Sequence, residues 1–230
     1  MRDMLGNSVF FGVMISILSY ELGVLLKKHL KLAIFNPLLI SIAAVILFLL
    51  ATGIDYESYN NGAQYLSYLL TPATVCLAIP LYEQVELLKK NVKSIFAGLI
   101  AGVATSCLSV FAFSMIFQLS HEEYVTLLPK SITTAIGMSI SEELGGIVTI
   151  TVAVIIITGV VGNILAEGIC KVFRITEPIA KGIAIGSSSH ALGTAKAMEL
   201  GEIEGAMSSL SIAVAGLLTV IAAPIFANLL

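Results

Sequence analysis

Charged side chains are scarce in this sequence. Asp, Glu, Lys and Arg make up 12% of the 230 residues, which is about half of the roughly 25% found in typical soluble domains. Hydrophobic residues make up 57%, and the mean hydropathy is +0.99. A soluble fold cannot cover so much apolar surface, whereas lipid-facing helices expose it to the bilayer. The composition therefore predicts an all-α integral membrane protein.

Several signatures of soluble function are missing. The net charge is −3 and there is no long basic tract, which argues against a nucleic-acid partner. Cys76, Cys107 and Cys170 are too far apart for a metal-spaced pair or a disulfide framework, so we expect neither metal nor cofactor. The motifs of a nucleophile elbow, a P-loop or a zinc protease do not occur, and we do not expect an enzyme.

Aspartate is also rare, and its positions bear on the cargo. The aspartates are Asp3 and Asp55, both outside the expected membrane core. A transporter that exchanges cations normally needs a carboxylate in the middle of the membrane to hold the cation. The shortage of such groups favours an anion as the transported species.

Long apolar stretches predict about seven to eight membrane segments in a single transmembrane domain, residues 1–230. The expected segments are residues 5–26, 32–52, 65–82, 94–119, 125–146, 147–169, 182–205 and 206–229. Thr71, Pro72 and Pro80 interrupt the third segment, so we predict two short pieces, the second starting near Pro72. The polar stretch GIDYESYNNG before it is expected to be an outer loop.

Basic loops set the expected topology, because Lys and Arg concentrate on the cytoplasmic side. Residues 125–146 are too polar for an ordinary span, and we predict that they re-enter the membrane without crossing it. The loop with Lys171, Arg174 and Lys181 is then inside, and ELGEIEG at 199–205 is outside. Residues 32–119 and 147–229 become antiparallel copies, each with a broken span. Such an inverted repeat with paired broken helices indicates a transporter binding site.

Polar residues gather where three helices are expected to begin inside the membrane. These places are after Thr71, around Pro129 and Lys130, and after the serines at 187–189. A helix N-terminus presents free N–H groups and a partial positive charge, which attract anions. A lysine at the bilayer centre costs about 2.5–3.5 kcal/mol, so we expect Lys130 and Lys196 to have a functional role. The alternative is that each lysine extends its ammonium group to the membrane surface.

Together these segments predict an anion-binding site. His190 is expected to contact the ligand or carry a proton, with a hydrogen-bonded packing role as the alternative, and Gly193 to allow close approach. The candidate substrate-binding residues are Thr74, Lys130, Ser131, Thr133, Thr134, Ser189, His190, Gly193, Thr194 and Lys196.

Four motifs resemble those of the LrgB/CidB family. They are NPLLI at 36–40, LTPATVCLAIPLY at 70–82, LPKSITTAIGMSISEELGG at 128–146 and SSHALGTAKAMELGEIEGAMSSL at 188–210. The likeness covers nearly the whole chain. It implies a multi-pass protein of the bacterial inner membrane with a small LrgA/CidA-like membrane protein as partner. The spacing of Gly98 and Gly102 permits close helix packing within the chain or in a homo-oligomer.

The resemblance implies two functions, and both stay open at this point. One is a secondary carrier of small monocarboxylates such as glycolate, glycerate or pyruvate, as in the similar plastid glycolate/glycerate translocator. The other is a holin- or antiholin-like protein that modulates murein hydrolase activity and cell lysis. A small carboxylate anion also suits the helix starts and lysines, so we take the carrier as the main hypothesis and the lysis-related role as the alternative.

Overall fold

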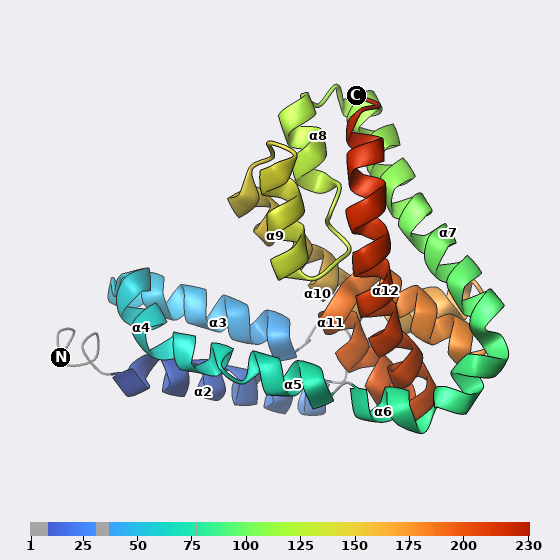
Figure 1. Ribbon diagram of the computed structural model, residues 1–230. Helices are drawn as coiled ribbons and strands as arrows, with labels where there is room; N and C mark the ends of the chain where they lie inside the picture. Colours follow the sequence, from blue (N-terminus) through green and yellow to red (C-terminus); the bar gives the residue numbers. More distant parts are fainter. Residues whose placement is uncertain (1–8, 31–36, 77) are drawn as a thin grey trace. The chain divides into compact units, whose positions relative to one another are not determined.

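The computed structural model describes residues 9–30, 37–76 and 78–230, and the regular elements among them are helices (Figure 1). The side chains of Leu70, Thr71, Thr74 and Leu81 lie outside the described part. The predicted all-α class is confirmed. The chain forms two compact units, residues 1–76 and residues 77–230.

Among the described residues, four helices are long and apolar enough to cross a membrane. They are Phe10–Leu30, Val85–Phe117, Val148–Val172 and Glu202–Ala227. The chain is therefore a multi-pass membrane protein, as predicted. The total of seven to eight segments stays a prediction, and the starts of the first two expected segments lie outside the described residues.

The first unit is built on helix α2. Its helices are α2 (Val9–Leu30), α3 (Pro37–Thr52), α4 (Tyr56–Ser67) and α5 (Leu70–Cys76). Both α3 and α4 pack against α2. The ring of Phe11 on α2 lies 6.1 Å from that of Phe48 on α3, and Ser16 forms a 2.8 Å hydrogen bond with Tyr59 on α4. Gly12 permits this approach, because a Cβ there would overlap the backbone of α4.

The stretch GIDYESYNNG, expected to be a loop, is mostly helical. The Asp55 carboxylate caps α4 by accepting hydrogen bonds from the backbone N–H of Ser58 at 2.8 Å and from its hydroxyl at 2.9 Å. These bonds hold the pKa of Asp55 below its usual range. With a capped start and α2 beside it, the polar sequence continues as a helix. Helix α5 begins at Leu70, close to the predicted start near Pro72.

The second unit contains the long helices α7, α10 and α12. Its elements are α6 (Ala78–Glu83), α7 (Val85–Phe117), α8 (His121–Leu127), α9 (Thr134–Glu143), α10 (Val148–Val172), α11 (Pro178–Leu200) and α12 (Glu202–Ala227). In Figure 1, α8 and α9 lie beside the upper half of α12, and α11 lies beside its lower half.

Helices α8 and α9 form a helical hairpin, which we call hairpin A (residues 121–143). The backbone N–H of Ile147, just before α10, donates to Thr126 Oγ1 in α8 at 2.8 Å. On α10, the Thr151 hydroxyl contacts both arms, reaching Thr126 O at 2.9 Å and Ser141 Oγ at 2.7 Å. The chain thus enters and leaves hairpin A at the same end, and residues 128–133 form its tip. The re-entry of residues 125–146 into the membrane stays a prediction.

Helix α11 is a second hairpin, hairpin B, because its path reverses at His190. That residue has φ 43° and ψ −140°, which is not helical. Gly193 lies directly against Ile185: a Cβ on Gly193 would stand 3.0 Å from the Ile185 carbonyl oxygen. In a straight helix, these two residues would be about 12 Å apart along the axis. Hairpin B therefore has a first arm, residues 178–189, and a second arm, residues 191–200.

Contacts with α12 confirm the reversal. Gly182 and Gly186 of the first arm lie against Glu204 and Ser208, so this arm runs parallel to α12. In the second arm, Thr194 bonds Ser208 at 2.8 Å, while Met198 lies against Gly205. The second arm is therefore antiparallel to α12, and hence to the first arm.

This reversal corrects the predicted topology around ELGEIEG. We expected residues 199–205 on the opposite side from the loop with Lys171, Arg174 and Lys181. Instead, Lys181 at the start of α11 forms a 3.7 Å ion pair with Glu204 at the start of α12. The prediction failed because α11 was taken as a span that crosses, whereas the turn at His190 returns it to its starting end. The inverted repeat of residues 32–119 and 147–229 stays a prediction.

Candidate functional site

Both hairpins contact Ile155, in the N-terminal half of α10. On the side of hairpin A, a Cβ on Gly137 would overlap the side chain of Ile155. On the side of hairpin B, His190 Nε2 lies 3.0 Å from the carbonyl oxygen of the same Ile155. The two hairpins also contact successive parts of α12: Ser208 contacts hairpin B, and Gly216 faces Ile136 of hairpin A. The hairpins thus enter from opposite ends and converge in the middle of the unit.

Helix α7 passes beside both tips and adds a serine. Ser106 on α7 forms a 3.1 Å hydrogen bond with Ser131 at the tip of hairpin A. One turn earlier, Gly102 lies against Ser187 near the tip of hairpin B, where an added Cβ would stand 2.9 Å from Ser187 Oγ. Serines from both hairpins therefore lie against successive turns of α7. We call the group Lys130, Ser131, Ser106 and Ser187 the tip site.

Lys130 supplies the positive charge of the tip site. Its ammonium group donates to Ser131 Oγ at 3.1 Å, and the side chain is partly buried. In the described part of the chain, no carboxylate forms an ion pair with it. An uncompensated cation inside a membrane protein is unfavourable by itself and is relieved by an anionic ligand.

Both tips also carry the start of a helix. Helix α9 begins at Thr134 with Thr133 as its N-cap, and the Thr133 side chain makes no capping bond. The second arm of hairpin B begins after His190. The positive ends of two helix dipoles thus lie at the junction, as expected of two of the three predicted helix starts. The third, after Thr71, belongs to the other unit, and the side chain of Thr74 lies outside the described residues.

His190 holds the tip of hairpin B in place. The residue is 5% exposed, and because only a protonated ring nitrogen can donate to a carbonyl, Nε2–H donates to Ile155 O. Gly159 on α10 makes room, since a Cβ there would come within 2.6 Å of the ring nitrogen. This arrangement favours the packing alternative for His190 over direct ligand contact.

The remaining predicted residues divide between the tip and the base of hairpin B. Ser189 is buried and bonds Ser188 at 3.1 Å, and Thr194 donates to His190 O at 3.0 Å. Lys196 lies at the base, paired with Glu199 at 3.2 Å and with Glu167 at 3.5 Å. The structure does not bring Lys196 to Lys130, because it stands six residues beyond the reversal.

Sequence reasoning missed Ser106, and it left Ser187 out of the candidate residues although it placed the serines at 187–189 in one of the site segments. The signal for Ser106 is a line of small residues on α7, since Gly98, Gly102 and Ser106 recur every four residues and share one face. The described residues contain no group of three or more His, Cys, Asp or Glu that could hold a metal ion.

The close fit of α10 against hairpin B gives a stability prediction. A Cβ on Gly162 would overlap the Ser189 side chain, so Gly162→Ala is expected to cost about 1–3 kcal/mol through overpacking. Gly168→Ala is the control on the same helix, because an added Cβ there meets nothing within 4 Å. It is expected to stabilise by about 0.5–1 kcal/mol. Thermal unfolding of the purified variants compares them, and equal stabilities would contradict the packing described.

Comparisons with known proteins agree with the motifs. A family model described as the LrgB-like family matches residues 16–229. The chain is similar to the antiholin-like proteins LrgB of Bacillus cereus (strain B4264) and Bacillus anthracis (strain CDC 684 / NRRL 3495). Each is 39% identical over 218 residues, which cover 94% of this chain and 95% of the relative. No solved structure gives a significant match.

Proposed function

We propose that this chain, which belongs to the LrgB-like family, is an antiholin-like membrane protein whose molecular activity is the transport of small monocarboxylates. The single observation that carries the transport proposal is Lys130. Its ammonium group lies at the tip of hairpin A beside Ser131 and has no acidic partner in the described part of the chain.

In this proposal, each group of the tip site has a role. The Lys130 ammonium pairs with the substrate carboxylate, helped by the N-terminal ends of α9 and of the second arm of hairpin B. The hydroxyls of Ser106, Ser131 and Ser187 bind the 2-oxo or 2-hydroxy oxygen and the remaining carboxylate oxygen. Glycolate, glycerate and pyruvate carry both groups on adjacent carbons. The site thus suits two- and three-carbon acids of this kind.

The hairpins themselves support a carrier. Non-helical backbone at membrane depth is tolerated where it is buried in protein or lines a water-filled cavity, and both tips interrupt the helical backbone near the middle of the unit. Hairpins that approach a central site from opposite ends are an inverted arrangement, which is how secondary transporters place their binding sites. A partner of the LrgA/CidA type and assembly as a homo-oligomer are part of the proposal.

The second candidate function is a holin- or antiholin-like role in murein hydrolase activity and cell lysis without a solute site. The relatives are named antiholin-like proteins, and this supports the lysis-related role more directly than it supports transport. The two functions are compatible, because transport changes the carboxylate concentration on both sides of the membrane and can thereby influence lysis.

Reconstitution into liposomes separates the two candidates. The purified chain, with and without an LrgA/CidA-like protein, is expected to take up labelled pyruvate, glycolate or glycerate in a saturable way and to retain an encapsulated dye. Unlabelled substrate should compete, and chloride should not. Dye release that is indifferent to these acids, together with no saturable uptake, would contradict the transport proposal and favour the second candidate.

A further inference from the structure

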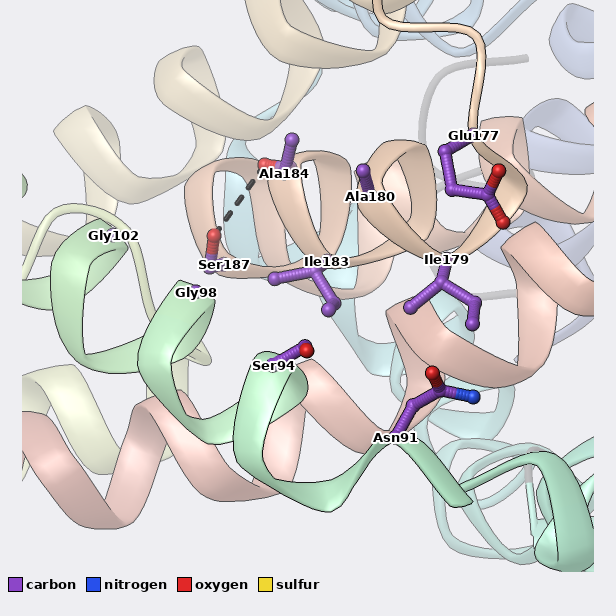
Figure 2. Close-up of a pocket in the computed structure, with 10 residues that line it drawn as sticks. All are labelled: Asn91, Ser94, Gly98, Gly102, Glu177, Ile179, Ala180, Ile183, Ala184 and Ser187. Atoms are coloured by element: carbon purple, nitrogen blue, oxygen red, sulfur yellow. Dashed lines mark hydrogen bonds between the residues drawn. The ribbon is translucent and has the colours of Figure 1, made fainter. Parts of the chain in front are cut away.

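A groove of about 520 Å³ runs between α7 and the first arm of hairpin B (Figure 2). Its outer end lies by Asn91 on α7 and Glu177 just before α11, and its inner end lies by Gly102 and Ser187. Figure 2 shows the two helices as its walls, with the side chains of Asn91 and Glu177 at one end and Ser187 at the other. The groove thus spans about three turns of α7.

Small residues let α7 and the first arm of hairpin B approach closely along this groove. On α7 the lining residues Ser94, Gly98 and Gly102 fall on one face, and Ala184 lines the opposite wall. A Cβ on Gly98 would stand 3.3 Å from Ile183 Cγ2, and one on Gly102 would stand 2.9 Å from Ser187 Oγ. A larger side chain at either glycine would therefore press against the opposite wall of the groove. The volume lies within the range of about 300–1,000 Å³ for small-molecule sites.

The inner end of the groove shares Ser187 with the tip site. Ser187 belongs to both, and Ser106, which bonds Ser131, lies one turn of α7 beyond Gly102. Polar side chains stand at both ends of the groove, with Asn91 and Ser94 outside and Ser187 inside. Lysines at 89, 90 and 93 flank the outer end in sequence and raise the local concentration of anions.

We propose that this groove is the pathway along which a small carboxylate, with its water, passes between the tip site and the membrane side that carries the base of hairpin B. The proposal rests on the transport function and names its access route. The basic residues at 89–93 and 171–181 place that side in the cytoplasm. The occupant is the solute itself, since the groove ends at Ser187, whose hydroxyl belongs to the tip site.

Cysteine labelling tests the pathway in the full-length protein. In a background with Cys76→Ser, Cys107→Ala and Cys170→Ala, single variants Ser94→Cys and Ala184→Cys are reconstituted and treated with a membrane-impermeant thiol reagent. Both are expected to react from the side of the hairpin B base. At a pyruvate concentration ten times its dissociation constant, the labelling rate should fall about tenfold, because about a tenth of the sites stay empty.

The control is Ile100→Cys on α7, because Ile100 is 54% exposed and does not line the groove. We expect this apolar face to contact lipid, so the variant should react slowly and without pyruvate protection. Pyruvate uptake is measured in the same vesicles before labelling. Uptake with no labelling of Ser94→Cys and Ala184→Cys, or with labelling that pyruvate does not slow, overturns the pathway alone. If the wild-type protein shows no saturable uptake, the transport function is overturned, and the pathway with it.

Discussion

Replacing Lys130 by methionine is expected to reduce pyruvate uptake by proteoliposomes about 10- to 150-fold, because a hydrogen bond to a charged group contributes about 1.5–3 kcal/mol. Methionine keeps an unbranched apolar stem and removes only the ammonium group. Lys130 has no acidic partner in the described residues, so the change leaves no carboxylate unpaired there. The variant should therefore fold, and should melt at the same or a higher temperature without substrate.

Lys196→Met is the matched control for this experiment. Lys196 pairs with Glu199 and Glu167 at the base of hairpin B, so its removal should lower the melting temperature and leave the KM for pyruvate unchanged. Lys130→Arg keeps the charge but changes its geometry, and partial uptake is expected. If Lys130→Met takes up pyruvate at the wild-type rate, this lysine does not bind the substrate carboxylate. If Lys196→Met has an increased KM for pyruvate, Lys196 contributes to substrate binding after all.

The sequence located both tips because polar residues in a membrane protein are costly. Lys130 and Ser131 in one segment, and the serines before His190 in another, interrupt apolar stretches, and such interruptions are retained where they are useful. Local composition was sufficient for this step. The helix starts were located only approximately: α9 begins at Thr134, a few residues after the predicted start around Pro129 and Lys130, and the second arm of hairpin B begins after His190, just past the serines at 187–189.

The reversal of α11 could not be predicted from the same segment. A position with φ 43° usually carries glycine, and Gly193, which stands three residues away, has an ordinary helical backbone. His190 adopts the unusual conformation because Ile155 accepts its hydrogen bond and Gly159 makes room for its ring. Both partners lie more than 30 residues earlier in the chain, so no local pattern reveals them. The predicted side of ELGEIEG was wrong for this reason.

The two lysines show the same limit. Lys130 and Lys196 have similar sequence surroundings, each a few residues from serine, threonine and glycine, and sequence alone gave them one role. Glu167 on α10, 29 residues before Lys196, decides the difference by pairing with it. Ser106 was missed because a serine within an apolar helix is unremarkable until the tip of hairpin A is placed beside it.

His190→Ala is expected to reduce pyruvate uptake by up to about 100-fold, the loss that a displacement of about 1 Å causes at a positioned site. Alanine removes the hydrogen bond to Ile155 that fixes the tip of hairpin B. It also keeps a Cβ at φ 43°, where backbone strain amounts to about 1–3 kcal/mol. Uptake and thermal unfolding of this variant are measured together, so that loss of position is separated from loss of fold.

His190→Gly distinguishes a reversal from an ordinary helix. Glycine adopts a positive φ without strain, so this variant should be more stable than His190→Ala by about 1 kcal/mol or more. Both variants lose the hydrogen bond from position 190 to Ile155. At Ala195, an exposed position in the second arm, Ala→Gly should instead cost about 1 kcal/mol. If the protein with glycine is less stable than the protein with alanine at both position 190 and position 195, then His190 lies in a continuous helix. The first arm, the second arm and the meeting of the two tips would then have to be abandoned together.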